Sequence, residues 1–375
     1  MKARAAVLGV IGADRPWEQT RPIEIRQIDL EAPRPGEVLV RMEAAGVCHS
    51  DLSRVSGVRE CHVPMVLGHE GCGIVEHVGA DVTGVSVGDK VTLTFMPRCG
   101  ECASCLAPGW RLCERGLAAN AAGEMLSGGR RIALDGMPID HHGGVSAFAE
   151  YAVVDQHSVV VLPHEIPSDV GALLGCAVLT GGGAVINAAR ARAGQSVAIV
   201  GLGGVGLAAA LVARAIGAHV TAIDTNPAKL TAATELVADD AFLPDEAIDA
   251  GKRFDVVVEC VGHPAALASA VSLTGVGGTT VTVGLSRPGS TVAVDSLALV
   301  TEARSLVGSY MGSGVPATDI QRYAEMYLDG TLPVERLITG STCLEDLNVA
   351  MDRLQDGLEI RQIVRFEPAT SGGEE

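Results

Sequence analysis

The run Ser196-Val-Ala-Ile-Val-Gly-Leu-Gly-Gly-Val-Gly206 decides how the second half of the chain folds. It starts with apolar, partly β-branched residues, its glycines are spaced Gly-x-Gly-x-x-Gly, and an Ala-rich segment follows. This order predicts a strand, a tight turn and a helix that form the phosphate-binding part of a dinucleotide site. Gly201 permits the turn, Gly203 lets the backbone approach a pyrophosphate, and Gly206 allows close packing of helix on strand. Gly204 belongs to the same loop, next to a helix N-terminus that favours negative charge.

Asp224 stands where such a fold uses an acidic residue, directly after the apolar segment 219–223. A carboxylate at this point accepts hydrogen bonds from the ribose hydroxyls of the cofactor and repels a 2′-phosphate. We therefore expect NAD rather than NADP as the cofactor. The alternative is that Asp224 only caps the turn before Asn226-Pro227.

The second half of the chain, from about Cys176, repeats this order of an apolar strand followed by an Ala-rich helix. Apolar runs alternate with Ala-rich stretches, an order that predicts α/β architecture with a doubly wound parallel sheet. The expected strands cover residues 196–200, 219–223, 254–259, 279–284 and 305–310.

The first half of the chain has a different pattern. Segments such as 37–43 and 73–78 are short, rich in β-branched residues and bounded by Gly or Pro, which predicts an irregular, mainly β domain. A C-terminal segment is expected to return to this domain, with amphipathic helices at 319–328 and 344–355 and a strand at 362–366. The predicted domains are residues 1–177 with 320–375, and residues 178–319.

Length, charge and hydrophobicity narrow the class of protein. A chain of 375 residues is long enough for two domains. The formal net charge of −17, without a cluster of Lys and Arg, argues against a nucleic-acid partner. Residues 197–218 are long enough to span a bilayer, but their glycine spacing fits a strand, a turn and a helix better, so we expect no membrane segment. Residues 1–13 weakly imitate a signal peptide, and we interpret them as a first strand.

Four of the ten cysteines are clustered, in Cys99-Gly-Glu-Cys-Ala-Ser-Cys105 and at Cys113. Two-residue gaps let Cys99, Cys102, Cys105 and Cys113 converge on one ion, and four thiolates favour tetrahedral zinc or an iron–sulfur cluster. We prefer zinc because nothing else in the sequence indicates one-electron chemistry. Closed four-sulfur coordination predicts a structural zinc that holds a lobe at about residues 97–115. Free or disulfide-paired surface cysteines are the alternative, but clustered thiols favour a reducing compartment, and we expect the cytoplasm.

Three further candidate ligands lie outside this lobe. They occur in Gly46-Val-Cys-His-Ser-Asp51, in Gly68-His-Glu-Gly-Cys-Gly73 and in the pair Gly175-Cys176. Each alone is weak evidence, since a lone buried Cys is usually a small hydrophobic residue. Together, Cys48, His69 and Cys176 would form a two-sulfur, one-nitrogen metal site with a fourth position open to water or substrate.

With these motifs the chain resembles, essentially from end to end, the zinc-dependent alcohol dehydrogenases of the medium-chain dehydrogenase/reductase family. Two thiolates and one histidine are the known ligand set of the catalytic zinc in alcohol dehydrogenase. The resemblance implies a GroES-like catalytic domain, a Rossmann cofactor domain and two zinc ions per subunit. It assigns Cys48, His69 and Cys176 to the catalytic zinc and places Glu70 close behind the metal. Asp51 would accept the ring N–H of His69 and fix its tautomer.

The implied reaction is hydride transfer between an alcohol and its aldehyde or ketone. It needs a Lewis acid that lowers the pKa of the alcohol, which zinc supplies. Ser50 is positioned in sequence to take the alcohol proton, although a turn serine is the plain alternative. Animal-type relatives commonly have a histidine three residues later, where this chain has Ser53. We therefore expect the proton to leave through Ser50, a ribose hydroxyl and water.

The resemblance also assigns cofactor contacts and pocket walls. His49 and Arg361 would meet the pyrophosphate, and Lys229 a ribose. The residues implied to flank the nicotinamide are Thr180, Val205 and the stretch from Val283 to Leu285. Phe95 and His142 fall where walls of the substrate pocket stand, and the histidine would make the pocket more polar. The alternative is that His141 and His142 lie on a solvated loop.

The segment between Cys113 and Gly144 resembles the longer lobe of dimeric animal-type enzymes. A homodimer joined through the cofactor domains, near residues 301–310, is therefore implied. A thiol-adduct-dependent formaldehyde dehydrogenase of the same family is the alternative activity. Its anionic thiol carrier would meet Arg111, Arg115, Arg130 and Arg131, although surface salt contacts would explain these arginines as well. A non-catalytic nucleotide-binding member of the family is a third hypothesis, but such a member would have lost the metal ligands.

Overall fold

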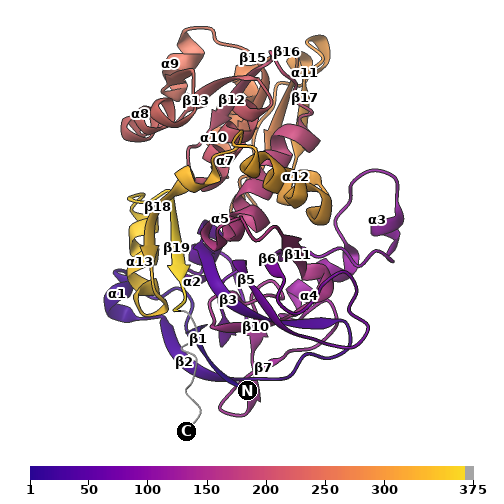
Figure 1. Cartoon of the computed structure of the whole chain (residues 1–375). Coiled ribbons are helices and arrows are strands. Elements are labelled where there is room, and N and C mark those ends of the chain that lie inside the picture. The colour runs from indigo at the N-terminus through magenta and orange to yellow at the C-terminus, as the bar shows by residue number, and fades with distance from the viewer. Residues whose placement is uncertain (368–375) are drawn as a thin grey trace. The chain divides into compact units, whose positions relative to one another are not determined.

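A computed structural model of the chain describes residues 1–367 (Figure 1). The chain divides into two compact units, which we call unit 1 and unit 2. Unit 1 comprises Met1–Gly175 together with the segment that starts at Ile338, and unit 2 comprises Cys176–Leu337. Residues 368–375, the end of the predicted returning segment, lie outside the described residues.

The second division lies after Leu337 and not near residue 320, because helix α12 (Pro316–Leu328) packs within unit 2. Asn187 Nδ2 donates to Asp319 Oδ2 at 3.1 Å. The ring of Tyr323 lies so close to Gly182 that a Cβ there would meet it at 2.8 Å. Amphipathicity predicts that a helix covers a core, but it does not say which core.

Unit 1 is built mainly from β-strands, as its short β-branched segments predicted. Its strands are β1 (Lys2–Leu8), β2 (Ile23–Leu30), β3 (Glu37–Val47), β4 (Met65–Val66), β5 (Glu70–Val78), β6 (Lys90–Leu93), β7 (Ile132–Leu134), β8 (Met137–Pro138), β9 (Asp140–His141), β10 (Tyr151–Asp155), β11 (Val159–Leu162), β18 (Ile338–Thr342) and β19 (Arg361–Arg365). Its helices are α1 (Trp17–Thr20), α2 (His49–Val55), α3 (Ala103–Leu106), α4 (Glu114–Ala121), η1 (Gln156–Ser158), α5 (Ser168–Leu173), η6 (Leu344–Asp346) and α13 (Leu347–Gln355). Residues 2–8 therefore form the expected first strand.

Two sheets organise these strands. One has the order β8-β7-β2-β1-β4-β9, and the other has the order β11-β6-β5-β3-β19-β18 with β10 also paired to β3. The returning segment enters the second sheet, because β19 pairs antiparallel with β3, with Gln362 opposite Val47 (Figure 1). The end of β3 leads directly into Cys48, so the return fixes the strand that carries the first candidate metal ligand.

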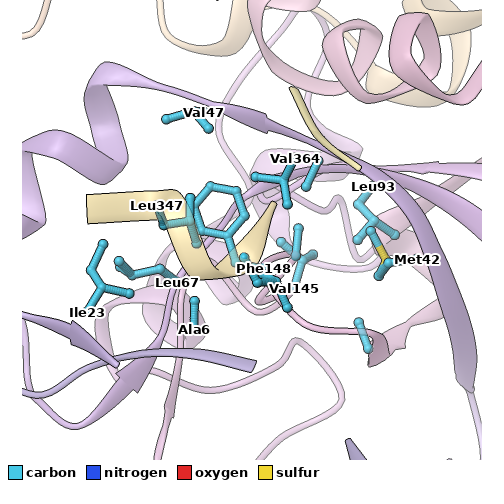
Figure 2. Packing of buried hydrophobic residues seen from close by; sticks show 14 of the residues in the cluster. Ala6, Ile23, Met42, Val47, Leu67, Leu93, Val145, Phe148, Leu347 and Val364 are labelled. Atoms are coloured by element: carbon cyan, nitrogen blue, oxygen red, sulfur yellow. The ribbon is translucent and has the colours of Figure 1, made fainter. Parts of the chain in front are cut away.

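The core of unit 1 is aliphatic, in keeping with an aromatic content of 3%. Figure 2 shows Phe148 among Leu67, Val145 and other small aliphatic side chains, with Leu347 and Val364 of the returning segment in the same cluster. Phe148, Leu347 and Val364 are all 0% exposed. Burying such side chains contributes about 1.5–3 kcal/mol each, so the returning segment is an integral part of the unit.

Unit 2 contains a parallel sheet with the order β14-β13-β12-β15-β16-β17. The strands are β12 (Ser196–Val200), β13 (His219–Ile223), β14 (Asp240–Phe242), β15 (Phe254–Glu259), β16 (Thr274–Thr282) and β17 (Ser305–Gly308). The other elements are η2 (Leu174–Val178, which crosses the division), α6 (Leu179–Gly183), η3 (Ala184–Ala188), α7 (Gly204–Ala215), α8 (Pro227–Leu236), α9 (Pro244–Asp249), α10 (Pro264–Leu273), α11 (Ser296–Thr301), η4 (Met311–Ser313) and η5 (Val334–Leu337), besides α12. The chain starts this sheet at its centre with β12, adds β13 and β14 on one side, and then continues with β15, β16 and β17 on the other side of β12. This is the doubly wound arrangement, which binds dinucleotides at the point where the chain changes sides.

A buried helical run links the two units along the chain. Within the part of the chain that the structure describes, Ser168–Ala188 is the helical run with the length and composition of a membrane span, with a mean hydropathy of 1.7. However, 83% of its most apolar window is buried inside the protein, as in the core helices of soluble proteins. Residues 197–218 form β12 and α7, as predicted from their glycine spacing.

Candidate metal centres and nucleotide site

The four cysteines of the lobe converge in the structure. Ligand atoms of Cys99, Cys102, Cys105 and Cys113 all lie within 4.8 Å of one another. Cys99 Sγ lies 3.9 Å from Cys105 Sγ, and Cys102 Sγ lies 3.9 Å from Cys113 Sγ. A tetrahedron with Zn–S bonds of about 2.3 Å has S···S edges of about 3.8 Å, whereas a disulfide bond is about 2.05 Å long. The spacing fits a four-thiolate metal centre and excludes disulfides between these pairs.

Backbone N–H groups point at two of these sulfurs. Cys99 Sγ accepts hydrogen bonds from the backbone of Glu101 and Cys102 at 3.5 and 3.3 Å. Cys113 Sγ accepts from the backbone of Cys99 and Gly116 at 3.4 and 3.3 Å. These backbone N–H groups point at sulfur atoms that would carry negative charge as metal ligands, and so they suit a four-thiolate centre.

The second candidate centre is formed by Cys48, His69, Glu70 and Cys176. Their ligand atoms lie within 4.8 Å of one another, and all four residues are buried. Cys48 is the N-cap of α2, His69 directly precedes β5, and Glu70 is the first residue of that strand. Cys176 follows Gly175, where a Cβ would lie 2.0 Å from the carbonyl oxygen of Leu93. Gly175 therefore lets the helical run approach the end of β6 and bring the second thiol to the cluster.

The donor atoms of this cluster fit a metal ion. His69 Nε2 is buried without a hydrogen-bond partner among the described residues, whereas His69 Nδ1 lies 3.0 Å from Asp51 Oδ1. Asp51 thus selects the tautomer whose Nε2 lone pair faces the thiols. Burial raises the pKa of Asp51, but the charge of His69 and the ring nitrogens of His142 and His69 beside the carboxylate lower it to about 2. The carboxylate therefore stays an acceptor.

Glu70 belongs to the same cluster and also pairs with Arg361 of the returning segment. Its Oε1 lies 3.0 Å from Arg361 Nη1, and Arg361 Nη1 also donates to the Val47 carbonyl oxygen at 3.4 Å. Burial raises the pKa of Glu70 to about 7, while the charge of Arg361 acts in the opposite direction. A Cβ at Gly46 would lie 2.2 Å from Glu70 Oε2, so β3 and β5 approach each other closely at this point. The predicted pyrophosphate contact of Arg361 stays a prediction.

The three residues after Cys48 begin helix α2 and differ in exposure. His49 is exposed and Ser50 is half-buried, whereas Asp51 is 0% exposed and accepts the Cys48 backbone N–H at 3.0 Å. Ser53 Oγ donates to the His49 carbonyl oxygen at 2.7 Å, an ordinary bond within a helix. The roles predicted for His49 and Ser50 toward cofactor and proton remain predictions.

Phe95 and His142 both pack on the ring of His69. Phe95 approaches it edge-on, with centroids 5.0 Å apart, and the His142 centroid lies 4.9 Å away. The alternative of a solvated loop at His141 and His142 is wrong, because these residues are only 1% and 6% exposed. Burial lowers the pKa of His142, against the effect of Asp51. Sequence reasoning missed the contact of His142 Nδ1 with Asp51 Oδ1, at 3.2 Å.

The glycine turn has the expected conformation. Gly201 has φ +92°, and a Cβ at Gly206 would lie 1.9 Å from the Gly201 carbonyl oxygen. A Cβ at Gly203 would meet nothing within 4 Å, so the protein itself does not require glycine there. An approaching pyrophosphate does require it, which fits a dinucleotide at the N-terminus of α7. Gly204 and Val205 form the first turn of that helix.

Asp224 caps the turn after β13 and also keeps free acceptor capacity for a ribose. Its Oδ2 accepts the Leu202 backbone N–H at 2.8 Å, and its Oδ1 accepts the Asn226 backbone N–H at 2.9 Å. The turn-capping alternative is therefore present, yet two further lone-pair sites remain for ribose hydroxyls. Asp224 is half-buried, and Lys229 is half-buried on α8 beside it in the chain.

The residues expected to flank the nicotinamide gather at the same edge of the parallel sheet. A Cβ at Gly181 would lie 2.4 Å from the Val205 carbonyl oxygen, so Thr180 adjoins the glycine turn. A Cβ at Gly284 would lie 1.9 Å from the Gly262 nitrogen, which seats the 283–285 stretch beside the loop after β15. Val283 is buried, whereas Leu285 is 48% exposed. The nicotinamide contacts of these residues stay predictions.

Comparison with known proteins identifies the family. The model of the alcohol dehydrogenase GroES-like domain matches residues 34–164, and that of the zinc-binding dehydrogenases matches residues 204–329. The chain is 35% identical over 364 residues to an alcohol dehydrogenase class-3 of Drosophila melanogaster, covering 93% of this chain and 96% of the relative. It is 36% identical over 378 residues to an S-(hydroxymethyl)glutathione dehydrogenase of Synechocystis sp., covering 98% and 100%. The crystal structure of benzyl alcohol dehydrogenase from Acinetobacter calcoaceticus matches with a TM-score of 0.89 at 28% identity, covering 98% and 100%.

The chain belongs to the zinc-dependent alcohol dehydrogenases of the medium-chain dehydrogenase/reductase family.

As a member of this family of zinc-binding dehydrogenases, the protein is an oxidoreductase that acts on CH–OH donors. The predicted fold class, a GroES-like mainly-β domain with a doubly wound cofactor domain, is confirmed. Two features of this alcohol dehydrogenase had no signal in the sequence. Glu70 and Arg361 stand far apart in the chain, as do Asp51 and His142, and no motif links either pair.

Proposed function

We propose that the protein catalyses reversible hydride transfer between NAD and a primary or secondary alcohol, aromatic alcohols included, to give the aldehyde or ketone. Cys48, His69 and Cys176 hold the catalytic zinc, and Cys99, Cys102, Cys105 and Cys113 hold a structural zinc. The convergence of two thiols and an unpartnered imidazole nitrogen within 4.8 Å carries this proposal. Three ligands leave a fourth position for an oxygen, as catalytic zinc sites require.

The chain's own residues divide the remaining work. Zinc, when bound, supplies the Lewis acid that lowers the pKa of the alcohol. Ser50, the half-buried second residue of α2, would accept the alcohol proton, and a bound cofactor would supply the ribose hydroxyl that leads on to water. The Ser53 hydroxyl donates its hydrogen to the His49 carbonyl oxygen, so this route does not depend on it.

Asp224 makes NAD the preferred cofactor. Its carboxylate is held by the backbone N–H groups of Leu202 and Asn226, which fixes it at the end of β13. Held there, it accepts the ribose hydroxyls of NAD and repels the 2′-phosphate of NADP. Lys229 and Thr180 complete the cofactor contacts in unit 2, with His49 and Arg361 assigned to the pyrophosphate.

An alcohol is favoured over a thiol adduct because most candidate carrier-binding arginines are already paired. Arg131 is 2% exposed and bound to Glu37. Arg130 donates to Asp140 at 2.7 Å, and Arg115 donates to Glu101 at 2.7 Å. The buried guanidinium of Arg131 is not available to an anionic carrier without breaking a charge-assisted bond, whereas the Arg115 side chain is 54% exposed and its surface pair with Glu101 is weak. Arg111 keeps an exposed position.

A substrate panel tests this proposal. Primary, secondary and aromatic alcohols are assayed with NAD, each with and without glutathione, and zinc is counted per subunit. We expect turnover of at least one alcohol class without the thiol and two zinc ions per subunit. Turnover of formaldehyde that strictly requires glutathione, with no activity on free alcohols, would instead establish the thiol-adduct reaction.

We further propose that the protein is a cytoplasmic homodimer joined through unit 2. Strand β17 forms an edge of the parallel sheet, and an edge strand offers unpaired backbone groups to a second copy. Gly277 N donates to the Glu302 carbonyl oxygen at 2.7 Å, so Val276 stands beside the end of α11. Val276, Leu297 and Val300 are 79%, 70% and 78% exposed, an apolar patch that a partner would cover. Light scattering of Val300→Glu against the unmodified protein tests the dimer.

A further inference from the structure

The carboxylate of Asp51 faces three donors inside unit 1. Its Oδ2 accepts the Cys48 backbone N–H at 3.0 Å. Its Oδ1 lies 3.0 Å from His69 Nδ1 and 3.2 Å from His142 Nδ1. The side chains are 0%, 1% and 8% exposed for Asp51, His69 and His142, so solvent does not compete for these contacts. The first two contacts come from the candidate zinc ligands Cys48 and His69, and the third comes from His142, which is not a candidate ligand.

His142 is itself fixed by the backbone. Its N–H lies 3.3 Å from the Val66 carbonyl oxygen and 3.1 Å from Ser146 Oγ, which in turn donates to Val66. Gly143 has φ +59°, and a Cβ there would lie 2.7 Å from the Phe95 Cβ. The turn therefore holds the His142 ring at one position beside Asp51.

Among the described residues His142 Nδ1 is buried without a hydrogen-bond partner, and the carboxylate oxygen that it approaches is Asp51 Oδ1, at 3.2 Å. The approach is a close charge contact whose angle is poor for a hydrogen bond. An ionised carboxylate is only an acceptor, so the hydrogen of the pair belongs on His142 Nδ1. The ring of His142 also packs against the ring of His69, with centroids 4.9 Å apart. Phe95 contacts the same His69 ring.

We propose that His142 is a positioning residue for the catalytic zinc and not only a wall of the substrate pocket. It anchors Asp51 Oδ1, and Asp51 in turn holds His69 with Nε2 directed at the metal. Asp51 is held by two hydrogen bonds, from the Cys48 backbone and His69, and the close approach of His142 Nδ1 to Oδ1 adds a third contact that opposes rotation of the carboxylate away from His69. The inference rests on the proposed zinc ligands, but it concerns zinc retention and not the substrate.

Matched variants separate the polar contact from packing. In His142→Asn the amide nitrogen takes the place of Nδ1, whereas in His142→Gln it takes the place of Nε2. His142→Phe keeps a ring without any donor. Zinc release from the holoenzyme into excess chelator is followed by an indicator dye, and the structural zinc of the four-cysteine lobe is the internal control.

We expect His142→Gln and His142→Phe to release the catalytic zinc about 10-fold faster, the effect typical of residues that orient metal ligands. His142→Asn should release it at the rate of the unmodified protein, and the structural zinc should be unaffected in all three. The absorption bands of the Co²⁺-substituted site should shift in the Gln and Phe variants and not in the Asn variant.

Two outcomes overturn the proposal. One is zinc release unchanged in both His142→Gln and His142→Phe, with only the KM for bulky alcohols altered, which leaves His142 as a pocket wall. The other is equally fast release in the Asn and Gln variants, since packing would then matter and the contact would not. If His142→Phe loses both zinc ions through misfolding, the comparison of Asn with Gln still decides. These readouts do not depend on turnover, so they remain informative even if the proposed alcohol activity fails.

Discussion

Replacing Arg131 by Met should destabilise unit 1 by about 3 kcal/mol, because it breaks a fully buried ion pair. Arg131 and Glu37 have side chains 2% and 0% exposed. Arg131 Nε donates to Glu37 Oε2 at 2.9 Å, and Nη2 binds Glu37 Oε1 in a second parallel contact. The pair joins the segment before His141 to strand β3.

The structure sets the size of this effect. Removing one partner of a buried pair costs about 3–5 kcal/mol. Glu37 would keep two donors, Ser127 Oγ at 2.7 Å and the Arg34 backbone N–H at 2.9 Å, which places the expected loss at the lower end. The double variant Glu37→Gln/Arg131→Met removes both charges and should recover to within about 1 kcal/mol of the unmodified protein.

Both tryptophans, Trp17 and Trp110, lie in unit 1, so urea unfolding followed by tryptophan fluorescence with zinc present reports on this unit. With a slope of about 2–3 kcal/mol per molar urea, Arg131→Met should lower the midpoint by about 1 M. A midpoint for Arg131→Met within 0.2 M (about 0.5 kcal/mol) of the unmodified protein would refute the reasoning. So would a double variant whose loss of stability equals the sum of the losses in Glu37→Gln and Arg131→Met.

Three other changes test the nucleotide site and the interior. Asp224→Ala should shift the ratio of kcat/KM for NAD over NADP toward NADP by about 10-fold or more, since hydrogen bonds to a charged group contribute about 1.5–3 kcal/mol; an unchanged ratio would count against the ribose contact. Gly206→Ala should abolish NADH binding measured by calorimetry, because its Cβ would lie 1.9 Å from the Gly201 carbonyl oxygen. Burial, with smaller effects of Arg131 and Arg130, lowers the pKa of His141 to about 3, so the unfolded state binds more protons below about pH 6.5 and stability falls as pH falls toward 3. At pH 5 this loss is about 2 kcal/mol, and His141→Asn should remove it from the measured pH dependence of unfolding; an unaltered slope would contradict the assignment.

The parallel sheet was predictable because its central strands are buried on both faces and appear as continuous apolar runs. Strands β12, β13 and β15 have the predicted bounds. Strand β16 begins at Thr274 and not at the predicted residue 279. The prediction missed residues 274–278 because they are rich in glycine and have little intrinsic strand preference. Pairing with β15 across an irregular register makes them a strand, an effect of tertiary contacts that local sequence does not encode.

The metal ligands were predictable for a different reason, namely that their spacing is local. Cys99, Cys102 and Cys105 are near neighbours, and such gaps alone indicate convergence. What holds the second centre is not local: Arg361 reaches Glu70 from the returning strand, and His142 reaches Asp51 from the segment after β9. A single sequence contains the partners of such pairs but not the pairing.

Two glycines, Gly46 and Gly175, matter to the second centre because they have no side chain. A Cβ at Gly46 would lie 2.2 Å from Glu70 Oε2, and a Cβ at Gly175 would lie 2.0 Å from the Leu93 carbonyl oxygen. Both values are far below any real contact of a Cβ atom. Alanine at Gly175 would meet backbone and force the helical run to shift, which would move the thiol of the next residue, Cys176. Alanine at Gly46 would push the Glu70 carboxylate out of its place next to Arg361. The two glycines next to the ligands are therefore part of the metal centre, and their role follows from close approach in space, where the sequence shows them only as neighbours of cysteine.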